Sequence, residues 1–324
     1  MKPPFSVIFL TTLIGIGQGL FLALFAAQLY SFFGLLPDQD SHNFYGRGSL
    51  IVLLFLGAGL IASFFHLGHP ERAWRSAAMW RTSWLSREVI VLPAFMGTVF
   101  LYGVAHWFNL QVPVIELADN HHVDITLVLG AIGVFLSFAL FICTGMIYAC
   151  LRFMQEWHTP LTPINLTLFG GASGFLMASV FASFMAPELT KFYAVWAIIL
   201  TLLAFIGRIA SLVRNSRIRP ISTMGTAIGI KHPHIVQISQ GAMGGSFNTR
   251  TFFHGKSDHF MRTIKPGFII LTFLLPLVLL AFGLTSPSLL LAALIIQYIG
   301  LLAERWFFFA EANHPQNLYY QKIA

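Results

Sequence analysis

Eight long apolar runs, separated by polar segments, constrain this chain more than any other feature. They lie at residues 6–34, 46–66, 88–108, 122–152, 162–186, 189–213, 265–285 and 287–309. Each run is compatible with a tilted transmembrane helix, which needs about 20 mostly apolar residues. The sequence therefore predicts an all-α fold, a polytopic membrane protein with eight transmembrane helices.

Composition supports this prediction. Hydrophobic residues make up 56% of the 324 positions and charged residues 10%, and the mean hydropathy is +0.75. These values exclude an ordinary soluble domain, so we expect one integral membrane domain over residues 1–324. The opening MKPPF runs straight into apolar sequence without a small-residue cleavage site. The first run is therefore expected to be a retained span and not a signal peptide.

The two cysteines, Cys143 and Cys150, lie seven residues apart in one apolar run. They are expected on one face of a helix, and they lack the closely spaced pattern that binds iron–sulfur clusters. Any such cluster is expected in a partner, and no metal site is expected in this chain.

A polar, basic segment at residues 215–264, rich in Gly, Ser and His, separates the sixth and seventh runs. It is too long for a simple turn. Its scattered Ile, Met and Phe residues favour a docked loop over a disordered one.

An even number of spans places both termini on one face. Seventeen of the nineteen Lys and Arg residues fall on that face, and only Arg47 and Lys191 fall on the other. The positive-inside rule then predicts cytoplasmic termini. A basic docking surface for an acidic partner is the alternative explanation of the same excess.

The segment between the second and third runs, His66 to Glu88, reads HLGHPERAWRSAAMWRTSWLSRE. It is expected to form a short hairpin at one membrane face, where ionisable residues are costly and usually functional. An interfacial aromatic belt is the simplest interpretation of the three tryptophans, Trp74, Trp80 and Trp84.

The patterns HLGHPERAW and RTSWLSRE resemble the DMSO reductase membrane anchor (DmsC-like) family. The resemblance continues in Thr226–Gly255 and in the tail ERWFFFAEANHPQNLYY, and it is strongest to the anchors of membrane-bound sulfite:quinone dehydrogenases. It implies an anchor subunit in the bacterial cytoplasmic membrane that binds a quinone, ubiquinone or menaquinone. Its partners would be an iron–sulfur subunit, a molybdopterin catalytic subunit and membrane lipids, with no nucleic acid.

By the same resemblance, His66 and Glu88 belong to the quinone site. An imidazole can donate a hydrogen bond to a quinone carbonyl and exchange a proton near neutral pH, and a carboxylate at the wet edge of the site can conduct protons. The alternative to a quinone role for Glu88 is a structural one. Glu88 follows Ser86, a plausible N-cap, and its negative charge would complement the positive end of the third helix. A metal site at His66 and His69 is disfavoured because no further ligand lies nearby.

Four more residues are candidate quinone contacts. Trp84 has the aromatic face to line a quinone ring. Arg81 would hold Glu88 ionised, although lipid phosphates and the partner protein are the commoner targets of interfacial arginine. Gln18, among glycines of the first run, either hydrogen-bonds across helices, which we favour, or reaches the quinone. The fourth candidate is Ser83 of the same hairpin.

Six residues are candidates for docking the iron–sulfur subunit: Arg72, Arg75, Lys231, His232, His234 and Arg250. None of the twelve histidines falls in the middle of a span, so no haem is expected. Arg208 and Glu304, in the sixth and eighth runs, are predicted to pair because lone charges in a membrane are expensive. Gly170 and Gly174 in the fifth run form a GxxxG pattern that favours helix packing.

The leading functional hypothesis is a redox anchor that passes electrons from an iron–sulfur subunit to quinone during cytoplasmic sulfite oxidation. A DMSO-type reductase anchor that oxidises menaquinol is the alternative within the family, and an anchor without its own quinone site is a simpler one. A secondary transporter is the rival class. Such proteins tend to show repeat symmetry and ionisable groups near the bilayer centre, and the middles of these runs are nearly free of charge.

Overall fold

The computed structural model describes residues 3–110, 112–116, 122–219, 221, 223–232, 234–235 and 254–315. Within this part, eight helical segments are long and apolar enough to cross a membrane. They are α1 (Phe5–Phe32), η1 with α2 (Ser41–Gly46, Arg47–Phe64), α3 (Trp84–Trp107), α4 (Ile125–Ala149), α5 (Leu161–Met185), α6 (Pro187–Ser216), α9 with η4 and α10 (Asp258–Ile269, Ile270–Leu274, Leu275–Phe282) and α11 (Pro287–Glu311). The predicted all-α membrane architecture is confirmed.

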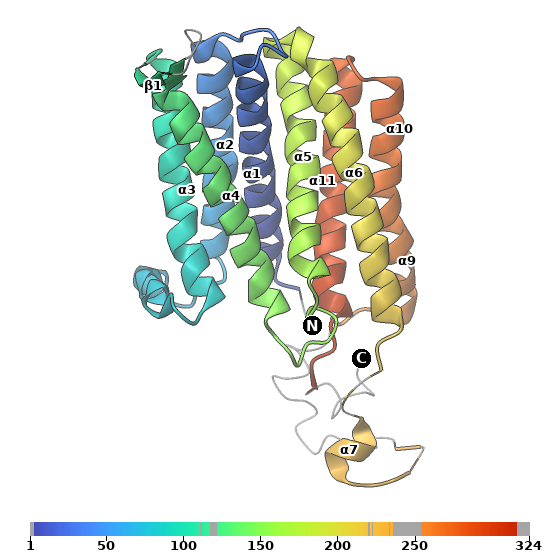
Figure 1. Cartoon of the computed structure of the whole chain (residues 1–324). Helices are drawn as coiled ribbons and strands as arrows, with labels where there is room; N and C mark the ends of the chain where they lie inside the picture. Colours follow the sequence, from blue (N-terminus) through green and yellow to red (C-terminus); the bar gives the residue numbers. More distant parts are fainter. Residues whose placement is uncertain are drawn as a thin grey trace.

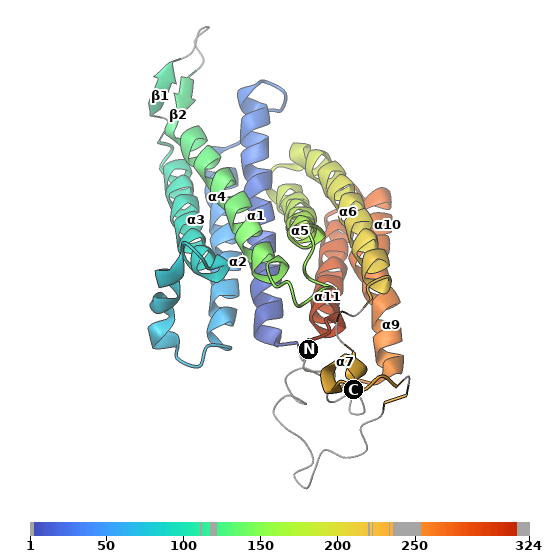
Figure 2. The same ribbon diagram turned by 60° about the horizontal axis from the view of Figure 1, so that its bottom comes forward.

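The helices stand side by side in one bundle (Figure 1). In this bundle α1 packs against α2, α4 and α5, and α5 packs against α6 and α11. The start of α1 and the end of α11 lie at the same end, together with the short 3₁₀ helix η2 (Pro70–Met79) that joins α2 to α3 (Figures 1 and 2). We call this the terminal end of the bundle. It carries the polar hairpin singled out from the sequence.

Several predicted spans differ at their ends, the second and the fourth among them. The second helix stops at Phe64 and not at His66. The fourth begins at Ile125, because residues 122–124 form strand β2 (His122–Asp124), paired antiparallel with β1 (Pro113–Glu116). Asp124 sets this start: its side chain accepts a hydrogen bond from the backbone N–H of Leu127 at 2.9 Å and so caps the helix.

In its described residues, the connection between α6 and α9 contains one short helix, α7 (Met224–Ile228). Thr223 and Thr226 form a capping box at its start, and Gly229 ends it with a φ of +72°, a left-handed conformation that glycine adopts without strain. Helix α9 starts at Asp258, so the last residues of the predicted 215–264 loop are helical. Residues 236–253 lie outside the described part, and the loop's docking role stays a prediction.

Glycines allow α1 and α5 to touch backbone to backbone. A Cβ atom on Gly19 would lie 2.0 Å from the carbonyl oxygen of Gly170, and one on Gly174 would lie 2.3 Å from the Cα of Gly19. No side chain fits in such spaces. The GxxxG pattern of the fifth span is therefore a packing surface, as predicted.

A buried chain of hydrogen bonds ties α1, α3 and α4 together near the opposite end. The Tyr102 hydroxyl donates to Gln28 at 2.8 Å, and the Gln28 amide donates to Thr126 at 2.6 Å. Thr126 in turn donates to Asp124 at 2.7 Å. Each of these polar groups thereby has a partner, as the apolar surroundings require.

Candidate functional site

His66 lies in the turn after α2, not inside it. The chain leaves the helix at Phe65, and the His66 backbone N–H donates to Ser63 at 3.3 Å. Its side chain is exposed at the terminal end of the bundle, although partial desolvation still lowers its pKa below the ordinary value. His66 is therefore held near the interface as a predominantly neutral imidazole at pH 7, able to donate one hydrogen bond and accept another.

Ser83 begins α3. Its hydroxyl accepts a hydrogen bond from the backbone N–H of Ser86 at 3.3 Å, which is the geometry of an N-cap. The predicted cap at Ser86 was wrong, because the helix starts three residues earlier and Ser86 is buried within its first turn. Ser83 thus has a structural task as the N-cap of α3, and its contact with a quinone stays a prediction.

Arg81 and Arg87 of the hairpin contact tryptophan rings, and Arg87 also binds backbone carbonyls of the hairpin. Arg87 donates to the carbonyls of Trp80 at 2.9 Å and Arg81 at 2.8 Å, and its guanidinium lies 4.2 Å from the ring centroid of Trp84. The exposed Arg81 guanidinium lies 5.4 Å from the Trp80 ring. These contacts fold the hairpin against the start of α3.

Glu88, one turn into α3, points into the bundle and accepts a hydrogen bond from the Thr144 hydroxyl of α4. Both residues line a cavity of about 30 Å³ between α1, α3, α4, α5 and α11. Gln18 and Arg305 also line it. A cavity of this size has room for water but not for a quinone ring. Glu88 therefore faces a small, mainly apolar cavity that contains a few polar side chains.

Gln18 connects helices, the role favoured from the sequence. Its side-chain amide donates to the Ser137 carbonyl of α4 at 2.8 Å, and the side chain is buried. Of the six predicted quinone contacts, the structure places Glu88 and Gln18 on one cavity wall. The other four, His66, Arg81, Ser83 and Trp84, belong to the hairpin and do not line that cavity.

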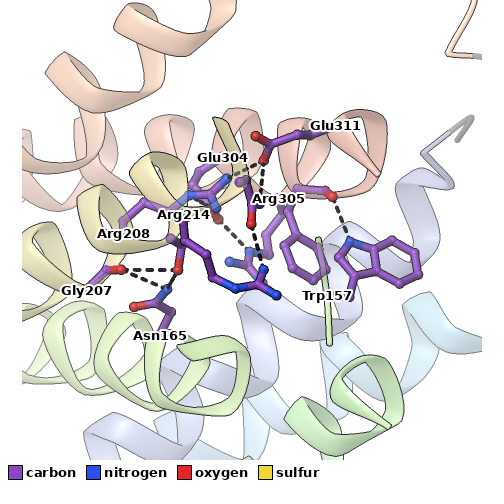
Figure 3. A network of polar contacts seen from close by, with 11 residues as sticks. Trp157, Asn165, Gly207, Arg208, Arg214, Glu304, Arg305 and Glu311 are labelled. Carbon is purple, nitrogen blue, oxygen red and sulfur yellow. Dashed lines mark hydrogen bonds and ion pairs between the residues drawn. The ribbon is translucent and has the colours of Figure 1, made fainter. Parts of the chain in front are cut away.

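Arg208 of α6 and Glu304 of α11 pair as predicted, with Nε and Oε1 2.8 Å apart (Figure 3). Two further residues join them. Arg305 Nε lies 2.6 Å from the other Glu304 oxygen, and Glu311 lies 3.9 Å from Arg208. We call these four residues the charge cluster. Its two arginines and two glutamates balance in formal charge.

Sequence reasoning missed Arg305 and Glu311. Arg305 was counted only as a basic residue of the cytoplasmic face, yet it is buried and its guanidinium lies over Phe169 and Phe308, at 5.1 and 4.7 Å from their centroids. The spacing held a signal, since residues 304 and 311 are two helical turns apart and so share one face of a helix.

The predicted docking residues divide into two groups. Arg72 and Arg75 are exposed on η2, and Glu71 lies between Arg72, at 3.7 Å, and His69, at 3.0 Å. Lys231, His232 and His234 are also exposed, and the His234 backbone N–H donates to the His232 ring at 3.1 Å. Arg250 lies outside the described residues. All six remain candidates for partner contact.

Within the part of the chain that the structure describes, no three His, Cys, Asp or Glu side chains gather as a metal site would require. The expectations that this chain binds no metal and no haem, and that iron–sulfur clusters and molybdopterin belong to partner subunits, stay predictions.

Among the residues that the structure describes, eight helices long and apolar enough to cross a membrane, a polar hairpin and buried charges gathered at one end indicate an integral membrane protein. The chain belongs to the DMSO reductase anchor subunit (DmsC) family, whose sequence model it matches over residues 1–309. It is also 55% identical over 326 residues, with both chains fully covered, to a sulfite dehydrogenase subunit of Allochromatium vinosum. The resemblance first noted in the His66–Glu88 hairpin is confirmed.

Proposed function

We propose that this chain is the quinone-binding membrane anchor of a three-subunit molybdopterin oxidoreductase in the bacterial inner membrane. It would pass electrons from a partner iron–sulfur subunit to ubiquinone or menaquinone during cytoplasmic sulfite oxidation. The supporting comparison is the full-length likeness to a sulfite dehydrogenase subunit. Both termini, the hairpin and the connection between α6 and α9 would face the cytoplasm, in keeping with the excess of Lys and Arg at that end.

The observation that carries the proposal is the position of Glu88. It lines a mainly apolar cavity inside the bundle, together with the polar side chains of Gln18 and Arg305, one turn from the hairpin that presents His66. Quinone reduction takes up two protons with two electrons, so it needs polar groups beside an otherwise apolar ring. His66 would donate a hydrogen bond to a quinone carbonyl at the membrane interface. Glu88 would supply a proton to the quinone from the interior of the bundle.

The chemistry balances across the complex. At the molybdopterin subunit, sulfite and water give sulfate, two protons and two electrons. The electrons cross the iron–sulfur clusters, and the quinone takes up both electrons and two protons to become quinol. Because electron tunnelling weakens steeply with distance, the quinone should bind at the face where the iron–sulfur subunit docks. The exposed basic residues Arg72 and Arg75 lie at that end, on η2, and we assign them to docking.

The test uses the complex purified from native membranes in mild detergent. We expect a molybdopterin subunit and an iron–sulfur subunit to co-purify, with no twin-arginine export signal on the catalytic subunit. An exported catalytic subunit would reverse the orientation and favour a DMSO-type reductase that oxidises menaquinol.

The quinone site is tested by His66→Ala and Glu88→Gln in that complex. Both variants should lower sulfite:quinone turnover by about 10²-fold, the usual contribution of one proton-transfer group. Electron transfer to a soluble acceptor that bypasses the membrane should be unchanged. His69→Ala in the same hairpin and Glu188→Gln, exposed at the opposite end, serve as controls. Unchanged quinone turnover in both test variants would favour an anchor without a quinone site of its own.

A further inference from the structure

A second, smaller cavity lies next to the Glu88 cavity, and Arg305 lines both. The second cavity, of about 10 Å³, is bounded by ends of α5, α6 and α11, and its polar wall includes Asn165, Arg208, Asn215 and Glu311. A space of this size admits about one water molecule. The two cavities therefore share one lining residue, Arg305.

Unpaired polar atoms indicate that this region holds water. Arg208 Nε and Glu304 Oε1 form an ion pair, but neither atom has an aligned hydrogen-bond partner. Arg208 Nη2 and Asn165 Oδ1 also lack a hydrogen-bond partner. Arg208 is 3% exposed and Glu304 0%. Buried polar atoms without protein partners are normally satisfied by ordered water. The distance of 3.9 Å from Arg208 to Glu311 is likewise one that a water bridges.

The charge cluster reaches the aqueous end of the bundle. Glu311 is the last residue of α11, its side chain is 20% exposed, and it accepts a hydrogen bond from Asn215 at 3.4 Å. Glu304 lies two turns deeper, about 10 Å along the helix axis. The neighbouring residue, Arg305, lines the larger cavity, which Glu88 also lines.

We propose that the charge cluster and its two cavities form the path by which protons reach Glu88 from the solution at the terminal end. The inference rests on the proposed quinone reduction. When Glu88 gives its proton to a quinone oxygen, the carboxylate is left in the cavity opposite Arg305. A proton from solution then enters at Glu311, crosses water beside Glu304, and returns Glu88 to its protonated form.

Each residue of the path has a definite task. The two arginines stay protonated, because a guanidinium does not release its proton in proteins. They orient the water and balance the negative charge that appears on Glu88. Glu311 exchanges protons with the solution, and Glu304 holds the two arginines in place. Glu88 passes through this cycle twice in one turnover, so the quinone takes up two protons, and the two electrons come from the iron–sulfur subunit.

The test measures steady-state sulfite:quinone turnover of the purified complex in H₂O and D₂O. Glu311→Gln keeps the shape of the entry residue but removes its proton exchange. We expect turnover to fall by about tenfold or more and the solvent isotope effect to rise, while electron transfer to a soluble acceptor is unchanged. Glu311→Asp should restore much of the rate. Glu188→Gln, an exposed carboxylate at the other end, is the matched control.

A second variant tests the water independently of charge. Asn215→Leu places an apolar side chain at the mouth of the smaller cavity and should give the same loss of turnover and the same isotope effect. If both variants keep wild-type turnover and isotope effect while Glu88→Gln is impaired, the path is overturned and the quinone site stands. If the wild-type complex reduces no quinone, the proposed function itself fails.

Discussion

The Arg208 guanidinium lies 2.8 Å from the Glu304 carboxylate, and the two side chains are 3% and 0% exposed. They come from different membrane helices, and each would be costly alone in an apolar interior. The pair therefore fixes α6 against α11 at one depth. Because Glu304 also contacts Arg305, one carboxylate compensates two cations.

Glu304→Gln should be the most damaging conservative change in the cluster. It leaves Arg208 and Arg305 without their central carboxylate, and breaking a buried ion pair costs about 3 kcal/mol or more. We expect a large drop in the unfolding temperature of the detergent-purified chain. Glu188→Gln should leave it unchanged, and an equal effect of the two substitutions would contradict a structural role for the pair.

Exchanging the two charges tests the pair directly. Arg208→Glu and Glu304→Arg should each prevent stable folding, and the double variant should recover part of the loss. Recovery should be incomplete, because an arginine at position 304 would stand beside Arg305. A double variant no more stable than either single one would show that the two side chains do not depend on each other.

The close approach of α1 and α5 should make Gly174→Ala destabilising. The added methyl group would lie 2.3 Å from the Cα of Gly19, so the helices must separate, at a cost of about 1–3 kcal/mol. The control is Gly97→Ala in α3, where nothing lies within 4 Å of the added atom. Thermal unfolding of both variants measures the difference, and equal stability would contradict the observed helix contact.

Removing the N-cap of α3 should weaken the helix that carries Glu88. Ser83→Ala is expected to cost about 1 kcal/mol, whereas Ser83→Asp keeps an acceptor at the same position. Hydrogen exchange of the first backbone amides of α3 is the sharpest readout. Faster exchange in Ser83→Asp than in Ser83→Ala would count against the observed cap.

His66 gives a pH prediction with a definite sign. Its pKa is lowered from 6.5 because partial desolvation disfavours the charged ring. As the pH falls, the histidine therefore takes up its proton at a higher pH in the unfolded chain than in the folded chain. Stability is retained above the ordinary histidine pKa and declines as the pH falls below it. Desolvation also lowers the pKa of His254 and of His314, so His66→Gln should reduce this decline without abolishing it, and unfolding temperatures at about pH 8 and pH 5 measure the change. A wild-type decline that persists unchanged in His66→Gln would assign it to other groups.

The sequence predicted the eight spans well because apolar length is a property of each segment alone. It also predicted the Arg208–Glu304 pair, since the cost of a lone charge in a membrane depends little on detailed geometry. Helix ends were less predictable: the strand before Ile125 and the cap at Ser83 depend on individual hydrogen bonds. The shared cavity of Glu88 and Arg305 was not predicted, because it depends on how five helices pack in three dimensions.

The contact between Gly19 and Gly174 also limits motion. Transporters alternate by rocking one half of the molecule against the other, which needs an interface that slides or opens. Here α1 and α5 meet where backbone atoms touch and no flexible side chain lies between them. Such a joint suits the proposed function, in which the separation between a redox centre and a quinone stays constant through every turnover.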